Sequence, residues 1–104
     1  MKHDELQKDH YYLMRGVKSI VLFHFSGNIE DASGYNNRPV KRIHCYSVIH
    51  VGDRVKAYVR DTCIMTFINQ EFKEITEDNY LKLVKLRKMF ELVIFPLIKQ
   101  LVKN

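Results

Sequence analysis

The side chains with the most chemical potential in this sequence gather between residues 38 and 60. This segment holds six basic residues against a single acidic one, and histidines and tyrosines are interleaved with them. Cations can hold a phosphate backbone and aromatic rings can stack on bases, so the combination is typical of a nucleic-acid-binding surface. The candidate binding residues are Arg38, Lys41, Arg42, His44, Tyr46, His50, Arg54, Lys56, Tyr58 and Arg60.

Lys, Arg and Tyr are also common on an ordinary solvated sheet face, so the pattern alone does not establish a binding site. If the segment does bind a partner, two binding functions remain open. The leading hypothesis is contact with nucleic acid, although no RNA-binding motif accompanies the basic residues. The alternative is an inhibitor or adaptor that docks an acidic protein surface. Such a module would use the same face, or residues 27–39 with Tyr35 exposed at the tip, and a host-directed inhibitor from a mobile element would fit this size.

Catalysis is the third hypothesis, in the form of a metal-independent nuclease. Arg42, His44, Tyr46 and His50 alternate along one predicted strand and would offer a cation, a general acid and a general base. Any strand produces this alternation, however. The cysteines lie in apolar runs with no feature that would lower a thiol pKa. We therefore predict a protein without catalytic activity.

Cofactor and metal motifs are not found in the sequence. The five histidines form neither a helical HExxH motif nor a set with a CxxC pair. The four glycines match no phosphate-binding loop, and the acidic residues between 61 and 78 lack the spacing of a calcium loop. The sequence therefore predicts no metal and no small-molecule cofactor.

The elements that would position these residues form an α+β domain. Residues 4–14 carry apolar side chains at helical spacing and predict a short helix before Gly16. Four apolar segments, residues 18–25, 40–51, 54–60 and 63–68, predict a four-stranded antiparallel meander. Residues 27–39 are rich in Gly, Asn, Asp and Ser and predict a long loop.

The strand over residues 40–51 separates into two faces if it is regular. The predicted apolar face consists of Ile43, Cys45, Ser47, Ile49 and Val51. The predicted polar and aromatic face consists of Arg42, His44, Tyr46, Val48 and His50.

Two registers are possible for the hairpin that follows. A two-residue turn at residues 52–53 would put Val55 on the face of His50. A three-residue connection would put Val55, Ala57 and Val59 on the apolar face, and we favour it on the hydrophobic pattern.

The C-terminal segment predicts a long helix. Thr76 can cap a helix that starts at Glu77, and Ile75 and Tyr80 have the spacing of a hydrophobic staple. The helix is expected to run towards Lys103 with a kink near Pro96. Because it is apolar around more than half of its circumference, we expect a homodimer through this helix.

The whole chain is sized for one domain spanning residues 1–104. Hydrophobic residues make up 46% and charged residues 28% of the sequence, and the net charge is +5. No apolar run approaches the roughly 20 residues of a membrane span, and the charged start does not resemble a signal peptide. We expect no membrane association, reduced and buried cysteines at 45 and 63, and a small cytoplasmic binding protein.

Overall fold

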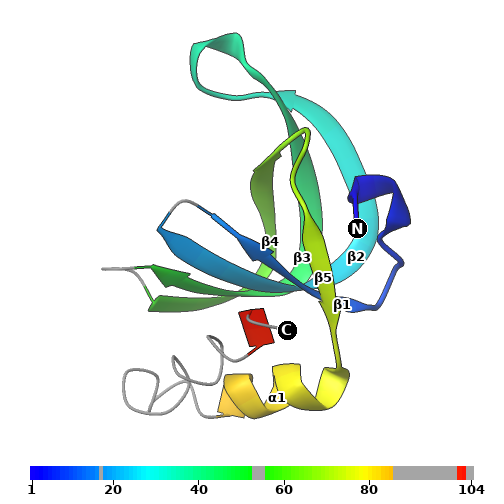
Figure 1. Cartoon of the computed structure of the whole chain (residues 1–104), viewed down its shortest axis with the longest axis vertical. Helices are drawn as coiled ribbons and strands as arrows, with labels where there is room; N and C mark the ends of the chain where they lie inside the picture. The colour runs from blue at the N-terminus through cyan, green and yellow to red at the C-terminus, as the bar shows by residue number, and fades with distance from the viewer. Residues whose placement is uncertain (17, 53–55, 86–100, 103–104) are drawn as a thin grey trace.

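The structure is a computed structural model that describes residues 1–16, 18–52, 56–85 and 101–102, without the side chains of residues 56 and 57. Within these ranges, five strands form one antiparallel sheet in the order β4-β3-β2-β1-β5 (Figure 1). The strands are β1 (Tyr11–Arg15), β2 (Ser19–Ser33), β3 (Pro39–Gly52), β4 (Lys56–Phe67) and β5 (Phe72–Ile75). One helix, α1 (Glu77–Lys85), and two 3-10 turns, η1 (His3–Glu5) and η2 (Tyr35–Asn37), complete the described elements.

The predicted α+β class is therefore wrong: the described fold is mostly a five-stranded sheet with one short helix. The segments 54–60 and 63–68, predicted as two strands, belong to one strand, β4. Asp61 lies between them with a φ of 49°, which kinks the strand without ending its pairing to β3. β5 is only four residues long and was not predicted.

The predicted helix over residues 4–14 is also wrong, because most of its apolar residues lie in β1. β1 pairs with β2 on one side and β5 on the other, so Tyr12 lies opposite both Phe23 and Glu74. Its successive side chains, Tyr12, Leu13 and Met14, are all buried on alternating faces. A strand covered on both faces is continuously apolar, and a continuous run also contains helical spacings by chance.

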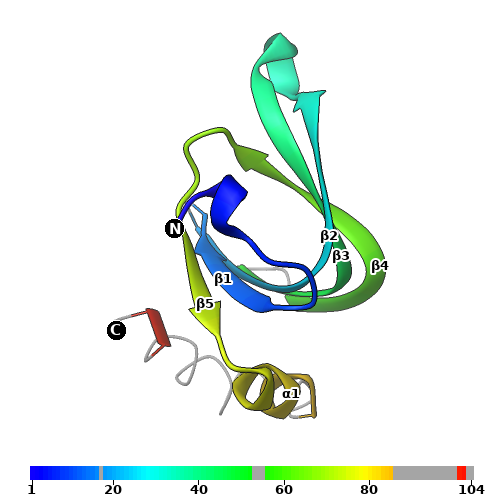
Figure 2. The same cartoon turned by 90° about the vertical axis from the view of Figure 1, so that its right-hand side faces the viewer.

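Each face of the sheet packs against a different segment. The inner face carries a cluster with Phe23, Phe25 and Phe72, against which Leu6 of the N-terminal segment packs. The outer face carries a second cluster with Leu22 and Ile49, and α1 covers it (Figure 2). From α1, the buried side chains of Tyr80 and Leu83 join this outer cluster.

A bulge makes the two faces of β3 exchange their residues. The pairing of β2 with β3 shifts where Phe25 meets Cys45 and His24 meets Ser47, so Tyr46 is an extra residue. Cys45 and Val48 consequently both contribute to the inner cluster. The predicted single apolar face through residues 43–51 is wrong for this reason.

Residues 27–39 form a projecting hairpin and not the predicted loop. β2 and β3 extend together beyond the rest of the sheet, and η2 closes their end (Figure 1). We call residues 29–43 the hairpin arm. Asn36 and Asn37 both have a φ of 58°, which this residue type tolerates better than most, so the chain can reverse tightly there.

The hairpin between β3 and β4 has a wider connection than either predicted turn. Val51 pairs with Lys56 and Val48 with Val59. Val59 therefore shares a face with Val48 and not with Ile49, so the favoured three-residue register is wrong. The hydrophobic pattern gave the wrong register because both faces of this sheet carry apolar clusters, so apolar residues do not mark one face.

The start of α1 matches its prediction, whereas most of the predicted length falls on residues outside the described part of the chain. Asn79 donates its backbone N–H to the Thr76 hydroxyl over 3.2 Å, which confirms Thr76 as the cap. Ile75 and Tyr80 join one buried cluster, as a staple requires. The described helix covers only Glu77–Lys85, so the predicted long helix is not part of the described structure. Most of its remaining predicted course, with the kink near Pro96, lies outside the described residues.

The homodimer predicted from that long helix is likewise not supported. The apolar side chains of α1 have a partner within the chain itself, since Tyr80 and Leu83 bury against the outer face. Leu101 and Val102 pack against the same cluster. The surplus apolar surface that suggested a second copy is thus partly covered by the sheet.

Candidate functional site

The predicted binding residues divide between the two faces of the sheet. Residues that lie opposite one another in a ladder point to the same face, and Ile43 is on the inner face. Arg42 and His44 therefore lie on the outer face of the hairpin arm, and Lys41 lies on the inner face. The bulge at Tyr46 then places His50 on the inner face as well, near Met14 and Val48 in a small hollow.

This division separates the two histidines of the nuclease hypothesis. His44 is on the outer face, and His50 is beyond the bulge on the inner face. A general acid and a general base must both reach one phosphodiester. The premise that His44 and His50 share a strand face is wrong.

The Glu30 carboxylate contacts the basic side chains Arg42 and His44 on the outer face. It lies opposite Arg42 in the ladder, and its carboxylate accepts a hydrogen bond from His44 and lies 3.8 Å from the Arg42 guanidinium. The His44 hydrogen bond, together with the nearby positive charge of His44 and Arg42, lowers the pKa of the Glu30 carboxyl. On the inner face, Lys41 pairs with Asp31 over 2.6 Å. The arm's charges are therefore largely compensated within the arm.

A row of aromatic rings runs from the core to the outer surface. The ring of Tyr80 is buried and lies 4.8 Å from that of Tyr11, which stacks on His24 at 4.1 Å. His24 contacts Tyr46 at 4.7 Å, and Tyr46 is the exposed end of the row. Burial lowers the pKa of His24, which favours a neutral imidazole in this row.

Arg60 and Tyr58 form the clearest cation–aromatic pair of the predicted set. The Arg60 guanidinium lies 5.9 Å from the centroid of the Tyr58 ring. Tyr58 packs against the outer cluster, whereas Arg60 is exposed. Within the described residues no ion pair includes Arg60.

The remaining predicted residues lie apart from these groups. Arg38 is exposed where the arm tip returns into β3. Arg54 lies outside the described residues, and Lys56 is described only by its backbone pairing to Val51. The structure therefore brings together Arg42 with His44, and Arg60 with Tyr58, but not the full set of ten.

The cysteines differ in their surroundings. Cys45 is buried on the inner face, and burial followed by the nearby Cys63 raises the pKa of its thiol to about 12. Cys63 is exposed opposite His44, so the prediction of two buried thiols is wrong for it. Both are free. Cys45 stays protonated at neutral pH and is unsuited to act as a nucleophile.

Sequence reasoning missed the apolar surface at the base of the arm, whereas its prediction of an exposed Tyr35 at the tip is confirmed. Eight large apolar side chains are exposed in the described part of the chain. Four of them lie on β4 or directly after it: Val59, Met65, Phe67 and Ile68. Tyr35, at the arm tip, is 88% exposed. The Gly-Tyr-Asn-Asn sequence at residues 34–37 is a turn signal that could have revealed the hairpin.

The pairing of β3 with β4 shows which side chains of this surface are neighbours. Val40 of the arm lies opposite Phe67, and Arg42 lies opposite Met65. These side chains share the outer face, because Ile43 faces inward. We call Met65, Phe67 and Ile68 the apolar row. Their exposures are 45%, 55% and 56%, respectively.

No three His, Cys, Asp or Glu side chains gather into a metal-binding group in the part of the chain that the structure describes. None of its helices is long and apolar enough to cross a membrane. Comparison of the chain with protein-family models, curated proteins and solved structures found no match. The site must therefore be interpreted from its own geometry.

Proposed function

We propose that this protein is a non-enzymatic binding module that docks another protein through its hairpin arm and the adjoining apolar row. The observation that carries the proposal is the concentration of exposed apolar side chains on one projecting part of the molecule. Tyr35 stands at the tip, and Met65, Phe67 and Ile68 lie along the base. Exposed apolar patches rimmed by polar groups are typical of protein interfaces.

The charge of the arm favours a protein partner over a polyanion. Residues 29–43 contain three basic and two acidic residues, which leaves a net charge of +1. Two of the basic residues, Lys41 and Arg42, face carboxylates of the same arm. A phosphate backbone would have to displace these contacts, whereas an apolar protein surface would not. A cytoplasmic location remains part of this proposal.

Capture from a lysate of the producing cells tests the proposal. The wild-type chain is compared with Tyr35→Ser and Phe67→Ser after nuclease treatment, and Leu81→Ser on α1 is the control at another exposed apolar residue. Loss of an interface anchor commonly costs about 2 kcal/mol, or roughly 30-fold in affinity. We expect the two arm-side variants, but not the control, to lose the same bound protein. Equal capture by all four chains would contradict the proposal.

Nucleic-acid contact is the second candidate, and one observation favours it. Arg60 and Tyr58 form a cation–aromatic pair on the outer face, on the strand next to the one that carries Tyr46. Bases stack on such groups. With Arg38, Arg42 and Arg60 as three phosphate contacts on duplex, the log–log slope of affinity against salt would be about −3. Fluorescence anisotropy with short DNA and RNA that detects no binding at low salt would remove this candidate.

A further inference from the structure

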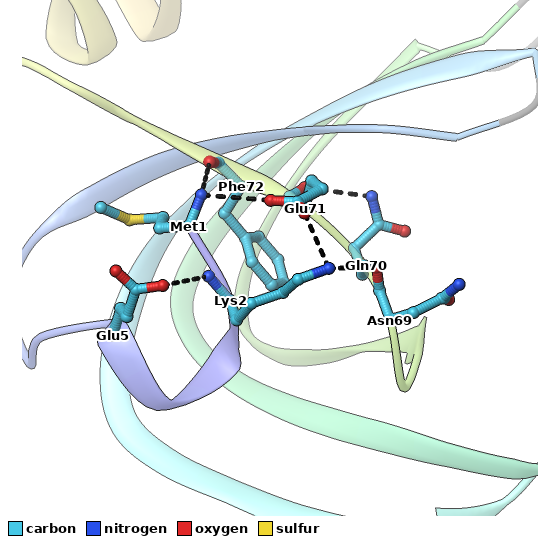
Figure 3. Close-up of polar contacts among 7 residues, drawn as sticks. All are labelled: Met1, Lys2, Glu5, Asn69, Gln70, Glu71 and Phe72. Atoms are coloured by element: carbon cyan, nitrogen blue, oxygen red, sulfur yellow. Dashed lines mark hydrogen bonds and ion pairs between the residues drawn. The ribbon is translucent and has the colours of Figure 1, made fainter.

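The two edges of the sheet are treated differently by the rest of the chain. β5 forms one edge, and Met1 pairs with it reciprocally: the Met1 amino group donates to the Phe72 carbonyl over 3.0 Å, and the Phe72 N–H donates to the Met1 carbonyl over 2.8 Å. Lys2 adds an ion pair to Glu71 at 2.7 Å (Figure 3). The outer edge of this short strand is thus already occupied at its first residue.

β4 forms the other edge of the sheet. In the described ranges it pairs with β3 alone, and its twelve residues make it three times as long as β5. Edge strands are usually protected by Lys, Pro or other charges. Residues 62–69 contain none of these. The kink at Asp61 lies within β4 directly before this stretch, so residues 62–67 are the uncharged part of the strand beyond the kink.

The side chains along this edge define what could pair with it. Phe67 and Met65 are exposed on the outer face, and residues 62–67 are uncharged. Beyond the kink, Arg60 is exposed, and no ion pair within the described residues includes it. A complementary strand would therefore be apolar opposite Phe67 and Met65 and acidic opposite Arg60.

We propose that the edge of β4 over residues 62–67 accepts an extended segment of the partner protein as a sixth, antiparallel strand. The segment carries apolar side chains at alternate positions and a carboxylate towards its C-terminal end, where it meets Arg60. Antiparallel addition continues the pattern of every other ladder in the sheet. Main-chain hydrogen bonds supply affinity in this mode and the alternate side chains supply specificity. This inference rests on the proposed function, because it names how that protein partner binds.

A synthetic peptide can test the inference on the full chain. The probe is acetyl-Val-Thr-Val-Thr-Val-Thr-Glu-amide, which in the antiparallel register puts its first Val opposite Phe67 and its Glu, in the same outer row as the Val side chains, next to Arg60. We expect its addition to shift the backbone amide NMR signals of residues 62–67 and to slow their hydrogen exchange. A matched peptide methylated on alternate backbone nitrogens, which blocks the ladder, should bind at least about tenfold more weakly.

A charge exchange tests the predicted direction of the added strand. Arg60→Glu should weaken binding of the Glu peptide, and replacing its Glu by Lys should restore binding to that variant. No amide shifts at millimolar peptide, or equal binding of the methylated peptide, would overturn the inference. Slowed exchange of the same amides without peptide, increasing with protein concentration, would assign the edge to a second copy and also overturn it.

Failure of this inference is distinguishable from failure of the proposed function. If the peptide leaves β4 unchanged while Tyr35→Ser still abolishes capture of a protein, strand addition is rejected and the docking function remains. If Tyr35→Ser and Phe67→Ser both capture as wild type does, the docking function is rejected.

Discussion

His3 and His24 are imidazoles that the fold holds in a neutral form. The Nε2 atom of His3 lies 2.7 Å from the Thr66 hydroxyl, and its ring meets Phe72 edge-on. Burial, followed by the charge of Lys41, lowers the pKa of His3 below its usual 6.5. Burial also lowers the pKa of His24. The folded chain thus binds fewer protons at these positions than the unfolded chain.

Stability should therefore fall as the pH falls below about 6.5, the ordinary pKa of histidine. Above that pH both histidines are neutral in both states and impose no penalty. Below it the unfolded chain takes up protons that the folded chain resists. Denaturant unfolding across this range should show a smaller pH slope in His3→Gln, and smaller still with His24→Gln added. Identical slopes in all three chains would contradict the assignment.

The hydroxyls of Tyr80 and Ser47 form a buried bond of 2.7 Å between α1 and β3. Tyr80→Phe removes one partner and leaves the Ser47 hydroxyl buried, so we expect a loss of about 1–3 kcal/mol in the free energy of unfolding. Adding Ser47→Ala to that variant should recover part of the loss. A double variant less stable than the sum of the two single changes would show that the bond is not the cause.

For single residues, the sequence identifies the candidate binding side chains, but it predicts poorly which face of the sheet each of them lies on. Arg42 and His44 do share a strand face, as alternation requires. His50 does not join them, because one extra residue at Tyr46 reverses the alternation beyond it. No residue type in the segment marks that bulge, which arises from the pairing of β3 with the bent β2.

The helix α1 shows which elements can be predicted from local signals. Its start depends on a hydrogen bond between neighbours in sequence, from the Asn79 N–H to Thr76. Thr76→Ala should cost about 1 kcal/mol, and Thr76→Ser should cost much less because it keeps the hydroxyl. Denaturant unfolding of the two variants provides the comparison. Equal losses for Ala and Ser would contradict a capping role.

β4 depends on an unusual backbone conformation in its middle. Asp61 has a φ of 49°, where a β-branched side chain is strained by about 1–2 kcal/mol. Asp61→Val should therefore destabilise the fold, whereas Asp61→Gly should be neutral or stabilising. Cys63→Val, at another exposed residue of the same strand, is the control and should be tolerated. A stable Asp61→Val variant would contradict the kinked geometry.

Elements that depend on distant partners were the ones predicted wrongly. β1 was taken for a helix because its burial on both faces comes from β2 and β5, which are remote in sequence. The hairpin arm was taken for a loop because its polar, two-stranded part buries little. Long-range pairing leaves no local period when both faces of a strand are covered.

The whole molecule presents one projecting arm and one open sheet edge on the same side of its fold. The base of the arm pairs with the end of β4, so Val40 and Phe67 are neighbours. The opposite edge is covered at Phe72 by Met1, and α1 covers the outer cluster. Exposed apolar side chains thus lie at the arm and along the β4 edge, and this arrangement is the basis of the docking proposal.

Site-specific photo-crosslinking tests the docking proposal most directly. A photoreactive phenylalanine analogue is placed at Tyr35, at Phe67 or, as a control, at the exposed Leu81 of α1, and each full chain is irradiated in the producing cells. We expect positions 35 and 67 to crosslink to one and the same protein and position 81 not to do so. Crosslinks to nucleic acid from 35 and 67, or the same products from all three positions, would contradict it.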